Sequence, residues 1–335
     1  MKTLTIITTA LLLATLPAAA AENQVETAKL SPEVRTAIDR GLAFLASRQL
    51  NDGSLNNQSP GGSQYLVADT ALALLAFMVQ GHVPGRGEYG KTMDAAIAYL
   101  VSVKPSGGNT VLYEHGLKTL ALSEAWGQSK NTNIRDALRA AVDVILRAQN
   151  GAGGWRYSLQ PVDADLSVTV MQLVALNSAR EAGIAVPDQT IQKAVGFVLS
   201  CWNPVGGGFC YQPSRGEENP RFVTTAAGVM SLIMSGQRDH PKTRRGLAIL
   251  DAFPDVKFKP SQGTYFLYGH YYAIQDMYQA GDTFFQPWYP KIAASLVNEQ
   301  WKDGSWNIQE GPIFSTAMAV MILGVPYRFV PIYQR

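Results

Sequence analysis

Acids and histidines at the starts of helical stretches are the residues whose types and spacing could do chemistry. Asp163 and Asp165 lie two residues apart, just ahead of an apolar stretch. His115 and His270 end two matched runs, Leu-Tyr-Glu-His and Leu-Tyr-Gly-His. Desolvation raises the pKa of a carboxyl group and so lets it serve as a general acid, while histidine can be an acid, a base or a ligand near neutral pH. We therefore take these four residues as candidate catalytic residues.

Each candidate also has a structural interpretation. Asp165 or Ser167 could cap the helix that follows, because both residue types are preferred at helix N-termini. A single histidine at a helix start is commonly a hydrogen-bonded structural residue, whereas the duplication of its run favours a functional role. Both alternatives stay open, and a functional role requires that all four candidates share one cavity.

Eight further residues near these runs are candidate ligand contacts. They are Tyr113, Glu114, Trp155, Tyr157, Tyr211, Arg221, Tyr268 and Tyr271. Aromatic side chains dominate the set, and an aromatic-lined cavity suits an isoprenoid chain, a cation formed from it, or a sugar ring stacked on an aromatic face. Packing of loops on helices is the alternative role for about half of the clustered aromatic residues.

The two cysteines, Cys201 and Cys210, flank a glycine-rich loop. In an exported protein this arrangement predicts a disulfide that closes the loop. Zinc requires three or four converging ligands, and no histidine lies near either cysteine in the sequence. We therefore expect no metal site and no cofactor.

A seven-residue motif recurs along the chain and indicates which elements position these residues. Its clearest copy reads Gln-Trp-Lys-Asp-Gly-Ser-Trp, and its glycines recur with a period of about 50 residues. The copies span 300–306, 49–55 and 149–155, with a shorter one at 207–209 and degenerate ones around Gly107 and Gly263. The glycine supplies a positive φ that ends a helix. A fixed period of this length predicts an array of one supersecondary unit.

The unit is a helical hairpin, because an amphipathic helix precedes each glycine-rich loop and a helix apolar on nearly every face follows it. The first amphipathic helix starts at Ser31, and the others are expected over 91–103, 133–148, 190–198, 242–250 and 290–297. The apolar helices are expected to begin near Asp69, Glu114, Leu166, Val223, Tyr268 and Phe314. Six outer helices around six buried inner helices predict an all-α fold, a closed α/α toroid of six hairpins. An open solenoid is disfavoured, because the last helix is as apolar as an inner one.

The repeat motif resembles the repeats of squalene and terpenoid cyclases and of protein prenyltransferase β subunits. This resemblance covers the mature chain and implies the α/α toroid. Type II cyclases carry an acidic Asp-x-Asp-Asp-Thr motif, whereas Asp163-Ala-Asp165 is followed here by Leu166. Prenyltransferases bind zinc partly through an Asp-x-Cys-Tyr run, and Cys210-Tyr211 lacks the aspartate. The chain thus departs from both sets of catalytic residues.

The N-terminus and composition indicate an exported, single-domain protein, periplasmic or secreted. Residues 1–21 have the basic start, apolar stretch and Ala-x-Ala end of a secretory signal peptide, which leaves 22–335 as the toroid domain. No later stretch has the length and hydrophobicity of a membrane span. With 16% charged residues and a net charge of +2, the sequence does not favour nucleic-acid binding.

Every glycine-rich loop precedes an inner helix, so the candidate residues should share one rim of the toroid. The resemblance implies a prenyltransferase- or squalene-cyclase-like repeat protein with a central cavity for an isoprenoid or another hydrophobic ligand. The alternatives are a polysaccharide-degrading lyase or hydrolase and a non-catalytic binding scaffold. The sequence does not establish whether the protein is an enzyme; the expected partner is a hydrophobic small molecule or a glycan.

Overall fold

The protein is a closed ring of helices in two layers. The computed structural model describes residues 30–56, 65–105, 110–129, 131–213, 219–262, 265–308 and 310–327. The outer helices of this part are α1 (Pro32–Ser47), α3 (Gly90–Ser102), α5 (Thr132–Ala148), α7 (Asp188–Ser200), α9 (Pro241–Ala252) and α11 (Asp282–Glu299). The inner helices are α2 (Leu66–Val79), α4 (Val111–Gln128), α6 (Leu166–Glu181), α8 (Phe222–Met234), α10 (Phe266–Ala280) and α12 (Pro312–Gly324). The predicted all-α toroid is therefore confirmed.

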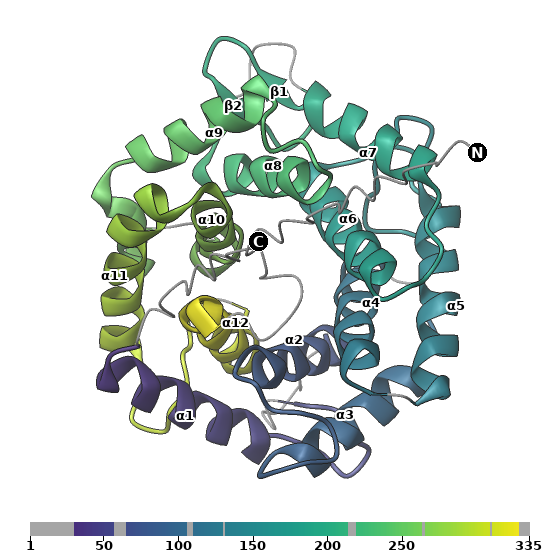
Figure 1. The fold of residues 1–335 in the computed structure, drawn as a ribbon, viewed down its shortest axis with the longest axis vertical. Coiled ribbons are helices and arrows are strands. Elements are labelled where there is room, and N and C mark those ends of the chain that lie inside the picture. The colour runs from purple at the N-terminus through teal and green to yellow at the C-terminus, as the bar shows by residue number, and fades with distance from the viewer. Residues whose placement is uncertain are drawn as a thin grey trace, which may run out of the picture.

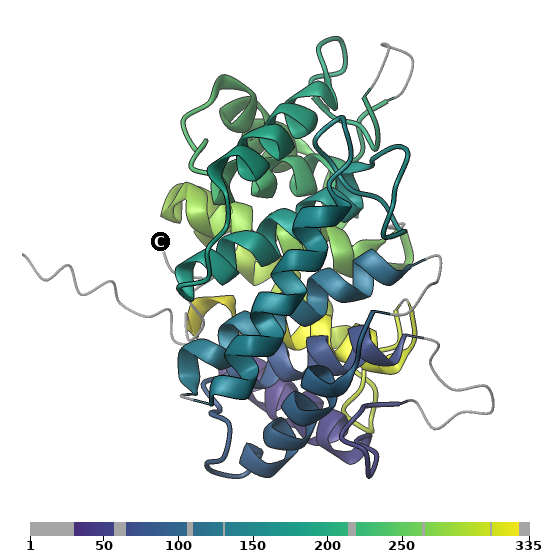
Figure 2. The same ribbon diagram turned by 90° about the vertical axis from the view of Figure 1, so that its right-hand side faces the viewer.

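The ring closes between its first and last hairpins. Each inner helix contacts the next, and α12 packs against α2 while α1 contacts both α11 and α12. Figure 1 shows the outer layer surrounding the inner one, and Figure 2 shows the same helices from the side. The open solenoid is excluded by these contacts.

The polarity contrast in the sequence corresponds to the two layers. All residues of α2 from Ala68 to Val79 are buried, whereas α5 buries only one face, including Ile134, Leu138 and Val142. At the start of α1, the Ser31 hydroxyl accepts the N–H of Val34, as its predicted cap position requires. The inner helices begin at the predicted residues or up to three residues earlier.

Short elements complete the described chain. Strands β1 (Trp202–Asn203) and β2 (Gly208–Phe209) form an antiparallel hairpin, and the 3₁₀ turns are η1 (Asp255–Phe258), η2 (Pro260–Gln262) and η3 (Val325–Tyr327). The predicted signal peptide and the degenerate copies at Gly107 and Gly263 lie outside the described residues. No helix in the described ranges has both the length and the hydrophobicity needed to cross a membrane.

In the three full copies of the repeat motif, the glutamine ties one outer helix to the next. Gln149 Nε2 donates to the carbonyl of Gly153 at 2.8 Å and to that of Thr190, in α7, at 2.9 Å. Gln300 forms the equivalent pair with Gly304 and with Ala37, which belongs to α1. The last copy of the motif therefore joins the end of the ring to its beginning.

The residue two positions after the motif glycine connects the two layers. The Trp155 indole donates to the carbonyl of Ile145 in α5 at 2.8 Å, and its backbone N–H donates to the hydroxyl of Thr169 in α6 at 3.1 Å. Trp306 repeats both bonds, to Leu296 and Thr316. The equivalent hydroxyls in α2 and α8 are those of Thr70 and Thr225. The motif thus connects α6 and α12 to the outer helices before them, and α2 and α8 to their preceding loops.

The cysteines lie next to one another at the base of the β1–β2 hairpin. The Cys210 N–H donates to the Cys201 carbonyl at 2.8 Å, which continues the pairing of Trp202 with Phe209. Both cysteines are buried. The disulfide stays a prediction: the protein purified without reductant is expected to have the mass of the oxidised form and to take up no thiol reagent after denaturation. Labelling of both cysteines under those conditions would overturn it.

Candidate functional site

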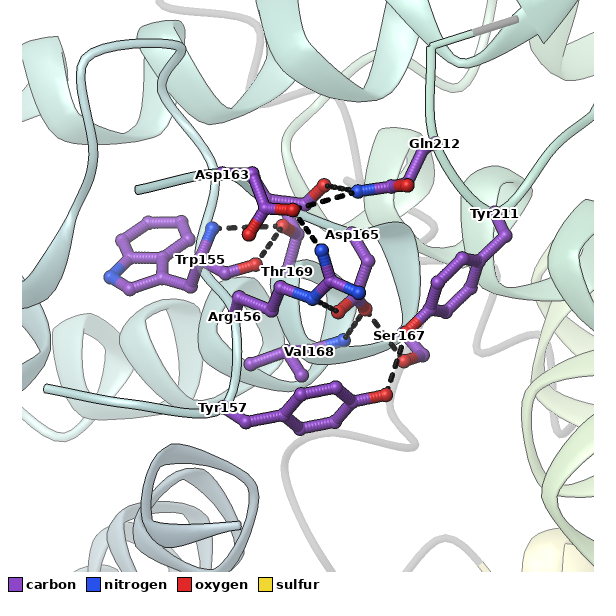
Figure 3. Close-up of polar contacts among 11 residues, drawn as sticks. Trp155, Arg156, Tyr157, Asp163, Asp165, Ser167, Val168, Thr169, Tyr211 and Gln212 are labelled. Atoms are coloured by element: carbon purple, nitrogen blue, oxygen red, sulfur yellow. Dashed lines mark hydrogen bonds and ion pairs between the residues drawn. The ribbon is translucent and has the colours of Figure 1, made fainter. Parts of the chain in front are cut away.

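A cluster of polar side chains joined by ion pairs and hydrogen bonds forms where the loop before α6 folds back on itself. Trp155 and Asp165 form an antiparallel bridge, with the Asp165 N–H donating to the Trp155 carbonyl at 3.0 Å. This bridge places Arg156 beside both Asp163 and Asp165 (Figure 3). The loop lies at the rim where the inner helices begin, as the sequence predicted for the two aspartates.

Asp165 is the N-cap of α6. Its Oδ1 accepts the Ser167 hydroxyl at 2.7 Å and the Val168 N–H at 2.9 Å, and its side chain is fully buried. The second oxygen lies 3.6 Å from Arg156 Nε. Burial raises the pKa of Asp165, although the bonds from Ser167 and Val168 partly oppose this. The structural alternative for Asp165, a helix cap, is therefore confirmed.

Asp163 is the exposed partner of the cluster. It forms an ion pair with Arg156, and about half of its side chain is exposed at 48%, against 30% for Arg156. Gln212 Nε2 donates to the Ala164 carbonyl at 2.9 Å and approaches Asp163 Oδ2 at 3.4 Å. Arg156 thus lies between a buried and an exposed carboxylate, and Asp163, Arg156 and Gln212 all reach solvent.

Tyr157 and Tyr211 connect this cluster to the inner helices. Their hydroxyls lie 2.6 Å apart (Figure 3), and the Tyr211 hydroxyl lies close to the Asp165 carboxyl group. The Tyr211 carbonyl accepts the N–H of Leu166 and the Tyr157 carbonyl accepts that of Leu112, at the starts of α6 and α4. Burial, followed by the neighbouring Tyr157 and Asp165, raises the pKa of Tyr211.

The matched runs bring two tyrosines together across the ring. The Tyr113 and Tyr268 ring centroids are 6.5 Å apart, although their helices α4 and α10 lie on opposite sides in Figure 1. Tyr268 also packs edge-on against Tyr272 at 5.0 Å and donates to the Ser167 carbonyl at 3.3 Å. Burial raises the pKa of Tyr113 and Tyr268. Tyr113 and Tyr268 are therefore packed against each other at the axis.

The structure does not bring the two histidines to this rim cluster. His115 Nε2 donates to the carbonyl of Ala141 in α5 at 3.0 Å, and His270 Nε2 donates to that of Lys257 in η1 at 2.7 Å. Both are buried, and burial lowers the pKa of each to about 4. The expectation that they share one site with the aspartates is thereby corrected.

The position of the histidines in their helices explains their duplication. Each is the fifth residue of its inner helix, the place taken by Thr70 in α2 and by Thr316 in α12. Where the threonine hydroxyl accepts a backbone N–H of the preceding loop, the longer histidine reaches a carbonyl of the outer layer. We infer that His115 and His270 join the two layers.

The remaining predicted contacts are divided between core and rim. Trp155 and Tyr271 are core residues, exposed by 0% and 2%. Arg221 is exposed at the start of α8, where its N–H donates to Thr224 Oγ1 at 3.2 Å. Glu114 is half-buried and accepts N–H groups of the first turn of α2; burial raises its pKa.

Arg156 and Gln212 are the rim residues that sequence reasoning missed. Their positions in the sequence could have indicated them, because Arg156 directly follows the tryptophan of a repeat motif and Gln212 directly follows the candidate Tyr211. Among the described residues, no group of three or more His, Cys, Asp and Glu side chains is arranged to hold a metal ion. With guanidinium and amide donors, carboxylate acceptors and a tyrosine ring, the cluster can bind a ligand rich in hydroxyl groups.

The comparisons with known proteins concern the fold. No family model matches the chain. An α-1,6-mannanase of the GH76 family from Salegentibacter sp. HEL1_6, an inactive double aspartate-to-asparagine variant in complex with α-1,6-mannotriose, is similar with a TM-score of 0.66 and 8% identity, over 87% of this chain and 98% of that one.

Two further solved structures belong to different enzyme classes. A type II terpene cyclase from Scytonema, in complex with geranylgeranyl dihydroxybenzoate, gives a TM-score of 0.59 and 14% identity, over 89% of this chain and 98% of that one. A β-1,3-1,4-glucanase from Paenibacillus sp. X4 gives a TM-score of 0.59 and 11% identity, over 91% of this chain and 93% of that one. At these identities the likeness shows that this chain has the α/α toroid fold of glycan hydrolases and terpene cyclases.

Proposed function

We propose that this protein binds a glycan at the rim cluster of Arg156, Asp163, Tyr157 and Gln212. The observation that carries the proposal is the placement of Arg156 between buried Asp165 and exposed Asp163. An arginine held on both sides is oriented before a ligand arrives, so less freedom is lost on binding. Its neighbours offer the acceptors and donors that sugar hydroxyls require.

Binding is better supported than hydrolysis by the surroundings of the two aspartates. Glycoside hydrolysis by a carboxylate pair needs one protonated carboxyl group that reaches the glycosidic oxygen. Asp165 has the raised pKa of such an acid, but its side chain is fully buried and caps α6. Asp163 reaches solvent and is bound to Arg156. The proposal is therefore a glycan-binding toroid.

An isoprenoid ligand is the second candidate, because tyrosines gather at the axis. Tyr113, Tyr268 and Tyr272 offer aromatic faces of the kind that suits an isoprenoid chain, and the repeat motif resembles that of terpenoid cyclases. The contacts between these rings weigh against it, since a prenyl chain would have to separate them. The exposed hydrogen-bonding groups around Arg156 need no such rearrangement.

The proposal is tested by calorimetric titration with defined oligosaccharides. α-1,6-mannotriose and a β-1,3-1,4-glucan oligosaccharide are the first probes, and geranylgeranyl dihydroxybenzoate tests the second candidate. We expect a glycan to bind and Arg156→Gln and Asp163→Asn each to weaken it about tenfold, since each removes a charge-assisted contact worth about 1.5–3 kcal/mol.

Arg135→Gln is the matched control, because Arg135 also pairs with an exposed aspartate, Asp136, on the outer surface of α5. It should leave glycan affinity unchanged, and both Arg135→Gln and Asp163→Asn should keep the melting temperature within about 2 °C, because exposed ion pairs contribute little to stability. Equal affinity of wild type and the Arg156 and Asp163 variants, or binding of the prenyl compound alone, would contradict the proposal.

A further inference from the structure

The second half of α10 buries polar side chains, as α4 and α6 also do, whereas α2 and α12 bury apolar ones there. Beyond Thr70 in α2 and Thr316 in α12, the buried residues are apolar to the end of each helix. In α10 the equivalent stretch buries Gln275, Asp276 and Gln279. The two-layer packing therefore does not require these polar side chains.

The polar residues lie on the side of α10 that faces the axis of the ring. Tyr268 points toward the axis, because its ring meets that of Tyr113 from α4 on the opposite side. Tyr272 follows one turn later, Asp276 lies four residues beyond Tyr272, and Gln275 lies three beyond it. Residues three and four apart are neighbours on a helix surface, so these side chains form one group.

Three acceptor atoms of this group have no hydrogen-bond partner among the described residues. They are both carboxyl oxygens of Asp276 and Oε1 of Gln275, and all three are buried. The Gln275 amide nitrogen is used, since it donates to the Tyr271 carbonyl at 2.7 Å. Buried acceptors are almost always satisfied in folded proteins, so their grouping points to an occupant that supplies donors.

The charges around the axis favour a cationic occupant. Burial raises the pKa of Asp276, and no cation among the described residues lies close enough to oppose this. On α4, Glu124 lies on the same helical face as Tyr113, is 2% exposed and accepts the Ser178 hydroxyl at 2.8 Å. An ammonium group would supply up to three N–H donors and a positive charge, and the tyrosine rings on the preceding turns attract cations.

We propose that the axial side of α10, centred on Asp276 and Gln275, binds an organic cation through its ammonium group. Asp276 supplies the opposing charge, Gln275 Oε1 accepts a further N–H, and Tyr272 lies against the alkyl part. This site is separate from the rim cluster of Arg156 and does not depend on the glycan proposal.

The test measures thermal stability and heat of binding with methylammonium, n-butylammonium and cyclohexylammonium chlorides, against sodium chloride at equal ionic strength. At least one of these ions is expected to raise the melting temperature and to bind with one-to-one stoichiometry. Asp276→Asn keeps the shape of the side chain and removes its charge, and it should weaken binding at least tenfold. Asp136→Asn, on the outer surface of α5, is the control and should bind like the wild type.

Two results would overturn the proposal. One is that none of the three ions stabilises the protein more than sodium chloride. The other is that Asp276→Asn responds to them as strongly as the wild type. A further variant, Asp276→Leu, distinguishes a cation site from a carboxyl group that is satisfied by trapped water. It should lose ammonium binding while remaining folded. A variant that is less stable but still binds the ammonium ions would contradict the proposal.

Discussion

Gly153→Ala is expected to lower the melting temperature by roughly 6–12 °C, through a loss of about 3 kcal/mol of unfolding free energy. Gly153 has a φ of +92°, and an added Cβ would lie 2.4 Å from the carbonyl oxygen of Lys193 in α7. The substitution therefore combines a left-handed backbone with a clash against another backbone, which cannot move aside as a flexible side chain could. Thermal unfolding followed by circular dichroism measures the effect.

Two other glycines separate the two contributions. Gly183 has a φ of +84° but nothing within 4 Å of an added Cβ, so Gly183→Ala should cost only the backbone strain, about 1–2 kcal/mol. Gly196 lies inside α7 with open space and no positive φ, so Gly196→Ala should stabilise slightly. If Gly153→Ala lowers the unfolding free energy no more than Gly183→Ala does, the close contact with the Lys193 backbone is not the reason why the motif requires glycine.

Acid is expected to destabilise the fold through His115 and His270. Burial holds the pKa of each near 4 in the folded protein, against 6.5 in the unfolded chain. Above pH 6.5 neither state binds the extra proton; as the pH falls from 6.5 toward 4, only the unfolded chain takes it up, so stability is lost. Each histidine should account for about 3 kcal/mol across this window.

The contribution is isolated by comparing the wild type with the double variant His115→Gln/His270→Gln in urea unfolding at pH 7.5 and pH 4.5. Glutamine keeps an N–H donor for the Ala141 and Lys257 carbonyls but does not titrate. The stability gap between the two proteins should narrow by about 5 kcal/mol at the lower pH. Leu122→Ala, a buried change in α4 without a titrating group, should keep a constant gap. A gap that does not change with pH for the double variant would show that the histidines are protonated in the folded state.

The sequence by itself determined the toroid. The motif contacts its own turn, its own outer helix and the next hairpin, through residues such as Gln149, Gly153 and Trp155. Because these contacts are local to the repeat, each copy of the same residues forms the same contacts. The alternation of amphipathic and largely apolar helices then assigned each helix to its layer. A helix buried on one side has a single apolar stripe, whereas a helix buried on all sides has apolar residues all round. The capping role of Asp165 was also within reach, since a cap is a contact with residues two and three positions on.

Only the tertiary structure decided where the side chains of the inner helices point. An inner helix is buried on every side, so its sequence pattern does not distinguish the face toward the axis from the face toward the outer layer. Tyr113 and His115 are two residues apart, about 200° around the helix, and the first meets Tyr268 at the axis while the second reaches Ala141 in the outer layer. Arg156 became a rim residue through the bridge between Trp155 and Asp165, a contact across a loop that no helical period encodes. Contacts that repeat with the chain could be predicted, and those that depend on the direction of a buried face could not.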